Sequence, residues 1–131
     1  MSRIRPTRTK AGRGRLAPRS AELLLEDAAA LIAAGWSQRA LARDADGREV
    51  EPWSDAACAW SPLGAMTNVW HESRGDELEV FETAYAALAL ATGGRPEEWN
   101  AARWRTQRHV VSAFSRARGF LPEAWREFDD D

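Results

Sequence analysis

The sequence predicts an all-α protein, a compact bundle of about four to five helices that allows a short β-hairpin near residues 43–51. Apolar residues recur at helical spacing in several segments, and residues that begin or end helices flank each of these segments. The chain has 131 residues, a length that favours one domain with its own hydrophobic core.

The first predicted helix has clear signals at both ends. Ser20 has the side chain of an N-cap, and Glu22 in the first turn opposes the helix dipole. Apolar residues follow at helical spacing as far as Ile32, and Gly35 is placed to end the helix as a C-terminal cap.

Turn-forming residues, rather than periodicity, guide the prediction for residues 36–51. Residues 36–41 could form a short helix, and residues 44–47 form a turn because aspartate and glycine favour tight turns. Residues 48–51 could be a short strand or extended chain, since Pro52 keeps the residue before it out of the helical region.

Two helical stretches are predicted in the middle of the chain. Ser54 or Asp55 can cap the first, which runs as far as Trp60. Ser-Pro at residues 61–62 then provides a new N-cap and first helical residue, and the helix continues to Trp70.

The C-terminal half contains the clearest helical periodicity, over residues 76–91. The apolar face of this helix is predicted to consist of Leu78, Phe81, Tyr85, Leu88 and Ala89. Residues 96–100 form a turn, Thr106 caps a further helix that Gly119 ends, and Pro122 at the first helical position begins a last short helix.

Charge is distributed unevenly along the chain. The first 19 residues contain seven basic residues and no acidic one, whereas all 20 acidic residues lie in residues 20–131 beside 11 arginines. We expect residues 1–19 to be a disordered basic arm and residues 20–131 to be a single helical domain. The arm could bind nucleic acid or an acidic partner. Its candidate residues are Arg3, Arg5, Arg8, Lys10, Arg13 and Arg15.

The sequence gives little support to catalysis or metal binding. Cys58 is the single cysteine, and its place in an apolar helical stretch is typical of a buried, inert thiol. His71 and His109 lack the spacing of metal ligands, and no glycine-rich loop precedes a helix. We predict no catalytic residue, no metal and no cofactor. Without a secretory signal or a membrane-spanning run, a cytoplasmic location is expected.

Tryptophan is abundant, with seven residues, so aromatic packing is expected to dominate the core or a pocket. The segment Trp-Asn-Ala-Ala-Arg-Trp-Arg-Thr at residues 99–106 is the most distinctive part of the chain. We favour a structural role, in which Trp99 packs in the core, Asn100 satisfies the turn and Thr106 caps a helix. The alternative is a ligand site with aromatic walls and an anion-binding arginine. Its residues would be Trp36, Gln38, Trp60, Trp99, Asn100 and Arg105.

Three segments together resemble a known family. They are Gly-Trp-Ser-Gln and the following Ala-Arg-Asp-Ala-Asp-Gly within residues 35–47, Trp-Ser-Pro-Leu-Gly-Ala at residues 60–65, and Trp-Asn with Arg-Thr within residues 99–106. In this order and spacing they are similar to a family of small bacterial and phage proteins classed as a domain of unknown function. The resemblance covers about residues 20–118 and implies a shared fold unit without an assigned activity.

The chain departs from the pattern of that family at four positions. Ser37 and Ser61 stand where the family often has cysteine, Arg39 where it has glycine, and Ala101 where it has aspartate. The resemblance therefore implies no chemistry that depends on those thiols or on that carboxylate. A structural role of the motifs tolerates these changes better.

These observations predict a small cytosolic, non-enzymatic binding, adaptor or inhibitor protein, associated with phages or mobile elements. Its partner is expected to be a protein, or else nucleic acid bound through the arm, and no membrane is involved. Alternatively, the acidic domain could occupy the nucleic-acid-binding groove of a partner. A small-molecule-binding protein or enzyme built on the Trp/Asn/Arg site is the other alternative. The oligomeric state stays open.

Overall fold

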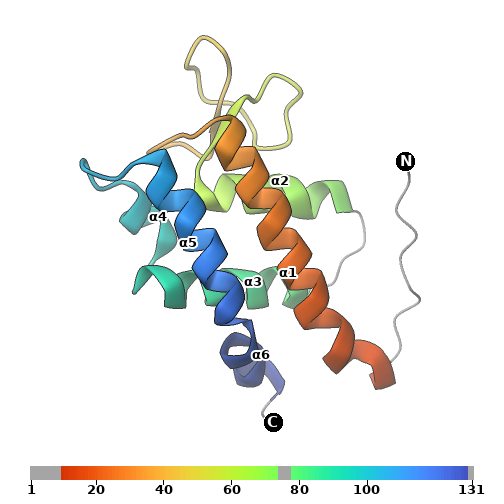
Figure 1. Cartoon of the computed structure of the whole chain (residues 1–131). Helices are drawn as coiled ribbons and strands as arrows, with labels where there is room; N and C mark the ends of the chain where they lie inside the picture. The colour runs from red at the N-terminus through yellow and green to blue at the C-terminus, as the bar shows by residue number, and fades with distance from the viewer. Residues whose placement is uncertain (1–9, 74–77, 130–131) are drawn as a thin grey trace.

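The computed structural model of the chain describes residues 10–73 and 78–129, which form six helices and one two-stranded sheet (Figure 1). The elements in chain order are α1 (Lys10–Ala34), β1 (Ala42–Arg43), β2 (Ala59–Trp60), α2 (Pro62–Ser73), α3 (Leu78–Thr92), α4 (Pro96–Asn100), α5 (Gln107–Gly119) and α6 (Leu121–Asp129). The predicted class, an all-α bundle with a short β piece, is confirmed.

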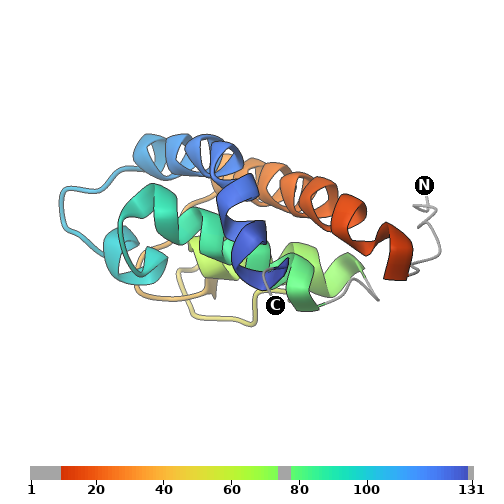
Figure 2. The same cartoon turned by 90° about the horizontal axis from the view of Figure 1, so that it is seen from below.

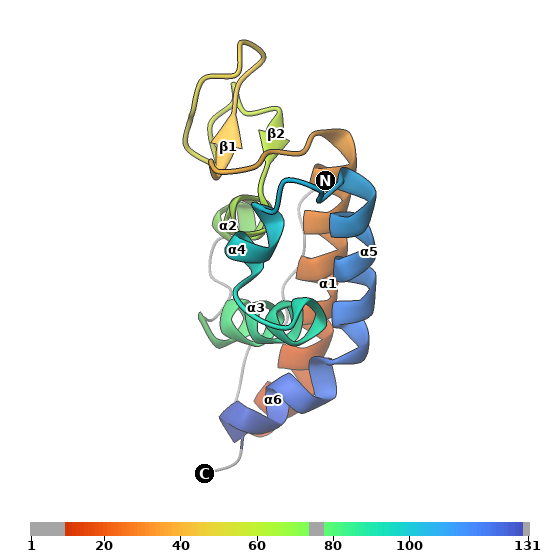
Figure 3. The ribbon, with the colours of Figure 1, turned by 90° about the vertical axis from the view of Figure 1, so that its left-hand side faces the viewer.

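The helices form two layers. α1 and α5 lie side by side in opposite directions, and α2, α3 and α4 lie beneath them (Figures 1 and 2). The small sheet lies at one end of the molecule, and α6 packs against α3 and α1 at the other end (Figure 3). None of the described helices is long and apolar enough to cross a membrane.

Alanine, and not tryptophan, dominates the interior. It supplies half of the buried apolar residues in the described part of the chain, and Phe114 is the largest fully buried side chain there. The tryptophans lie mostly at the edge of this core. Trp60 is buried, whereas Trp53 and Trp104 are exposed. The expectation of a core dominated by aromatic packing is therefore wrong. The single methyl group of alanine lets the helices approach closely, which leaves little space between them for large rings.

α1 begins at Lys10, ten residues before the predicted start. Ser20 consequently lies inside the helix and is not its N-cap. Once a helix is nucleated by tertiary packing, each added residue gains one main-chain hydrogen bond, so it extends at little cost. Residues 1–9 of the predicted arm lie outside the described residues, and the arm stays a prediction.

Residues 36–41, for which the sequence allowed a short helix, are irregular and not helical. Their main chain pairs instead with β2. The amide of Ser37 donates to the carbonyl of Trp60 at 3.0 Å, and the amide of Trp60 donates to the carbonyl of Gly35 at 3.0 Å. Gly35 is needed because of this close approach and not as a left-handed cap, since an added Cβ would overlap the carbonyl oxygen of Cys58.

The predicted turn at residues 44–47 is present. The carboxylate of Asp44 accepts hydrogen bonds from the amides of Asp46 and Arg48, each at 2.9 Å, and Gly47 has a φ of 81°. The amide of Asp44 also donates to the carbonyl of Arg48 at 2.9 Å, which pairs the two sides of the turn within the predicted hairpin region.

The predicted helix that ends at Trp60 is wrong. Ala59 and Trp60 form β2, which pairs antiparallel with β1 so that Ala42 lies opposite Trp60. Cys58 is exposed in the segment before β2 instead of buried in a helix, and its amide donates to the carbonyl of Arg43 at 2.9 Å. The extended conformation is favoured over a helix because it satisfies main-chain groups on two distant segments at once.

Two predicted helix starts are confirmed by their caps. The Ser61 hydroxyl accepts from the amide of Gly64 at 3.1 Å at the start of α2. The Thr106 hydroxyl accepts from the amide of His109 at 3.2 Å at the start of α5. The predicted turn at residues 96–100 is the short helix α4.

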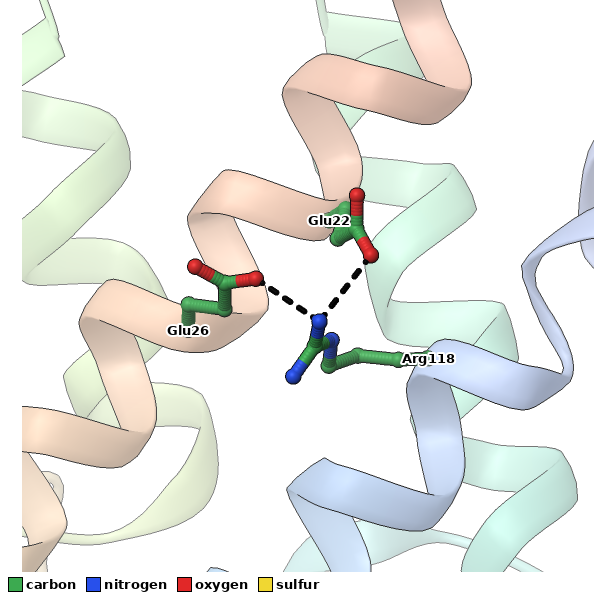
Figure 4. A network of polar contacts seen from close by, with 3 residues as sticks. All are labelled: Glu22, Glu26 and Arg118. Atoms are coloured by element: carbon green, nitrogen blue, oxygen red, sulfur yellow. Dashed lines mark hydrogen bonds and ion pairs between the residues drawn. The ribbon is translucent and has the colours of Figure 1, made fainter.

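A charged network joins α5 to α1. The guanidinium of Arg118 lies 3.1 Å from a carboxylate oxygen of Glu22 and 3.0 Å from one of Glu26 (Figure 4). All three side chains are about 40% exposed, so each pair stabilises the fold by only a fraction of a kcal/mol.

Arg39 has a φ of 67°, in the left-handed region that costs a residue with a Cβ about 1 kcal/mol. We expect Arg39→Gly to raise the free energy of unfolding by about that amount, measured by urea denaturation. Arg48→Gly is the matched control: Arg48 has no positive φ, and glycine should destabilise the turn there. A loss of stability in both variants would contradict this explanation.

Candidate functional site

The structure brings the loop after α1 into contact with the end of α4. The indole N–H of Trp36 donates to Asn100 Oδ1 at 2.8 Å, and Asn100 Nδ2 donates to the carbonyl of Ser37 at 3.0 Å. Gln38 Nε2 donates to the carbonyls of Asn100 and Ala102 at 2.8 and 3.0 Å. We call Trp36, Ser37, Gln38 and Asn100 the Asn100 clasp.

The polar atoms of the clasp bond to one another and to main chain. Asn100 is only 1% exposed, and both ends of its side-chain amide are engaged. A ligand that used these atoms would have to break bonds that satisfy buried groups, which costs free energy. The clasp therefore has a structural role, but it joins two distant segments of the fold instead of satisfying the turn at residues 96–100 as predicted.

The main chain of Trp60 pairs with the clasp segment, but its side chain does not join the clasp. Its indole is buried, and its N–H donates to the carbonyl of Pro52 at 3.0 Å. Asn68 Nδ2 donates to the same carbonyl at 2.8 Å. The indole N–H of Trp60 thus holds the segment before β2 and does not point toward Asn100.

The remaining two predicted ligand residues, Trp99 and Arg105, are partly buried and form a different arrangement with the exposed Trp104. The guanidinium of Arg105 lies over the rings of Trp99 and Trp104, with its central carbon 3.8 and 4.0 Å from their centroids. Arg105 Nε donates to the carbonyl of Trp99 at 2.9 Å. Trp104 is 68% exposed, and His109 lies edge-on to it with centroids 6.3 Å apart. We call Trp99, Arg105 and Trp104 the Trp–Arg stack.

The stack lies in a basic stretch of the described chain. Residues 101–109 contain three arginines and no acid. Within residues 10–73 and 78–129, Arg103, Arg105 and Arg108 have no ion-pair partner, in contrast to Arg118. Partial burial lowers the pKa of Arg105 from its usual value, but an arginine stays charged at neutral pH. The connection from α4 to α5 projects from one end of the molecule (Figure 2).

The sequence analysis missed three of these residues, Arg103, Trp104 and Arg108. The available signal was an arginine flanked by two tryptophans in a stretch without acids. Of the predicted arm residues, Lys10, Arg13 and Arg15 lie on α1, and Arg3, Arg5 and Arg8 lie outside the described residues. In the part of the chain that the structure describes, no three potential metal-ligating side chains gather.

Glu97 on α4 has a partly buried carboxylate that meets the start of α2. Its Oε2 accepts from the amide of Leu63 at 2.9 Å, and Ser61 donates a second hydrogen bond. Burial raises the pKa of Glu97, because desolvation outweighs the two hydrogen bonds. Burial and the nearby Glu97 charge also raise the pKa of Tyr85.

The raised pKa of Glu97 makes the stability of the protein depend on pH. A folded state that holds the proton more tightly is favoured below the ordinary pKa of about 4.5, and this advantage is lost as the pH rises through the raised value. Glu97→Gln is neutral throughout, so we expect it to gain stability relative to the wild type between pH 4 and pH 7. Urea denaturation at both pH values measures this.

Glu98→Gln, at an exposed carboxylate on the same helix, is the control for the loss of one negative charge. A Glu97→Gln variant that loses stability relative to the wild type on going from pH 4 to pH 7 would show that the hydrogen bonds to the carboxylate outweigh its desolvation.

Comparison with known proteins finds one family. The family described as "Family of unknown function (DUF6197)" matches residues 17–120, which is about four-fifths of the chain. No curated protein and no solved structure matches the chain. The matched region includes both the Asn100 clasp and the Trp–Arg stack. The chain belongs to this family of unknown function, DUF6197.

Proposed function

We propose that this protein is a non-enzymatic binding protein that recognises an anionic partner through the Trp–Arg stack and the adjacent Arg103 and Arg108. The observation that carries the proposal is Trp104, an indole that is 68% exposed although an arginine lies against it. Exposed tryptophan and arginine are the residues that most often dominate the energy of binding interfaces.

The stack is organised before any partner arrives. Two rings and the hydrogen bond from Nε to the carbonyl of Trp99 hold the Arg105 side chain in one position. Little side-chain freedom is then lost on binding, which favours affinity. The unpaired charges of Arg103 and Arg108 add electrostatic attraction for an anion.

The alternative of an enzyme or a small-molecule pocket has less support. Of its six residues, Trp36, Gln38 and Asn100 use their polar side-chain atoms in the clasp, and Trp60 uses its N–H on Pro52. Only Trp99 and Arg105 are placed to meet a partner. A cytoplasmic location and an association with phages or mobile elements stay predictions from the sequence.

Trp104→Ala is expected to weaken binding of the partner at least tenfold, because the variant removes the exposed ring of the interface. The full chain is immobilised, components of an extract of the source cells are captured, and both protein and nucleic acid in the eluate are identified. A true partner should be retained by the wild type, released by salt and lost with Trp104→Ala.

Trp53→Ala is the matched control. Trp53 is also exposed, at 41%, but it stacks on His71 and belongs to the segment between β1 and β2. Both variants should keep the free energy of unfolding within about 0.5 kcal/mol of wild type, as exposed positions usually do. Identical capture by wild type and Trp104→Ala would refute the proposed binding surface.

A further inference from the structure

We infer that the anionic partner is single-stranded nucleic acid, whose bases stack on Trp104 and whose phosphates pair with Arg103, Arg105 and Arg108. This inference rests on the proposed function and names the class of partner. A single strand combines flat rings and negative charge in one ligand, and the Trp–Arg stack offers the complement of both.

The ring part of the argument rests on Trp104. Its neighbours in the described chain are Arg105, against the ring, and His109, at 6.3 Å and nearly perpendicular. These contacts leave 68% of Trp104 exposed. A base can therefore stack on the Trp104 ring and extend the stack formed by Trp99, Arg105 and Trp104. Stacking of bases on aromatic side chains tolerates any sequence, because every base has a π-face.

The phosphate part rests on Arg105. Its Nε is bonded to the carbonyl of Trp99, but among the described residues its terminal nitrogens have no acceptor. A guanidinium edge binds a phosphate through two parallel hydrogen bonds. The two rings hold that edge in place.

The start of α5 provides an independent reason to expect an anion. The N-terminal end of a helix carries partial positive charge, which an acidic residue or a bound anion can offset. The first turn of α5 has no acid and contains Arg108. Positive charge therefore accumulates at this end, and a phosphate would relieve the repulsion.

Other anionic partners fit less well. The bases of a duplex are stacked inside the helix and cannot reach Trp104. The rest of the domain is acidic and would repel a long, rigid polyanion, whereas a flexible strand can contact residues 103–108 alone. An acidic peptide supplies charge but no ring for the indole.

The test uses the full chain and a fluorescently labelled ten-nucleotide oligothymidylate, with binding followed by anisotropy. If three phosphates are neutralised, the logarithm of the affinity should fall with the logarithm of salt concentration with a slope of about −2. Trp104→Ala should weaken binding about tenfold. Trp53→Ala and Arg48→Ala, at exposed positions outside residues 101–109, should bind as the wild type does.

An abasic oligomer of the same length and charge separates stacking from charge, and it should bind clearly more weakly than oligothymidylate. Oligouridylate of the same length tests whether RNA binds as well as DNA. Equal binding of the abasic oligomer, or unchanged binding by Trp104→Ala, would overturn the inference and would indicate attraction by charge alone.

A decaglutamate peptide tests the competing class of partner. Binding of this peptide without binding of oligothymidylate would overturn the inference in favour of an acidic protein partner, while the proposed function would survive. Binding of neither probe would also overturn it. The proposed function fails separately, if capture from the extract does not depend on Trp104.

Discussion

Gly64→Ala is expected to destabilise the fold by about 3 kcal/mol or more, although alanine is normally the better residue in a helix. A Cβ at Gly64 in α2 would overlap the carbonyl group of Leu41. That carbonyl oxygen cannot move away freely, because it accepts a hydrogen bond from the amide of Ser61 at 3.1 Å. The substitution must therefore push α2 away from the loop that precedes β1.

Gly94→Ala is the matched control for this prediction. Gly94 has open space around its Cα and no positive φ, so alanine there should change the free energy of unfolding by less than about 0.5 kcal/mol. Urea denaturation followed by circular dichroism measures both variants. Equal stability of Gly64→Ala and Gly94→Ala would show that the loop can yield without cost.

Asn100→Ala is expected to cost about 2–3 kcal/mol of folding free energy. It removes the acceptor of the Trp36 indole N–H and the donor to the carbonyl of Ser37, and Asn100 is too buried for water to replace it easily. Trp36 should then show altered fluorescence in the folded state. Urea denaturation gives the loss of stability.

Asn68→Ala provides a comparison at the same residue type. Asn68 donates to the carbonyl of Pro52, but Trp60 also donates to that carbonyl, so no buried acceptor is orphaned. We expect a loss below about 1 kcal/mol. If Asn100→Ala were no more costly than Asn68→Ala, the clasp would not be a main source of stability.

The features that the sequence predicted well are local. The caps at Ser61 and Thr106 and the turn at residues 44–47 depend on hydrogen bonds between residues at most four positions apart. The side chain that makes such a bond is visible in the sequence itself. These elements could therefore be found without knowledge of the tertiary structure.

The features that failed depend on distant partners. Trp60 is extended and not helical because its main chain pairs with Gly35 and Ala42, and no local pattern encodes that pairing. The α3 face was predicted only in part: Leu88 is buried as expected, but Leu78 is exposed, and Phe81 and Tyr85 are half-buried. The side chains of α3 that are buried are Val80, Thr83, Ala84, Ala87 and Leu88.

The reason for the error in α3 is that this helix has neighbours on more than one side. It contacts α1, α5 and α6, and its aromatic side packs toward α2, where Phe81 lies 5.5 Å from Trp70 between ring centroids. The aromatic residue Phe81 lies on the α2 side, whereas the deeply buried side includes Thr83, Ala84 and Ala87, so hydrophobicity alone does not identify the most buried positions.

For the site, the sequence indicated which segments matter but not what they do. Residues 36–38 and 99–105 do meet, yet Asn100 joins them while Arg105 faces outward with Trp104. Whether a tryptophan is buried or exposed depends on the position of neighbouring helices. Trp104 could therefore be recognised as a surface residue only from the structure.

The alanine-rich interior has a consequence for how this protein can change. Alanine has no side-chain torsion to immobilise, so burying it costs no side-chain conformational entropy. The same interior cannot repack around a larger residue, since small side chains have no volume to yield. We therefore expect sequence variety mainly at exposed positions such as Trp104 and Arg103, which can be exchanged without moving a helix. We expect the binding properties of this fold to diversify at its surface while its interior stays nearly fixed.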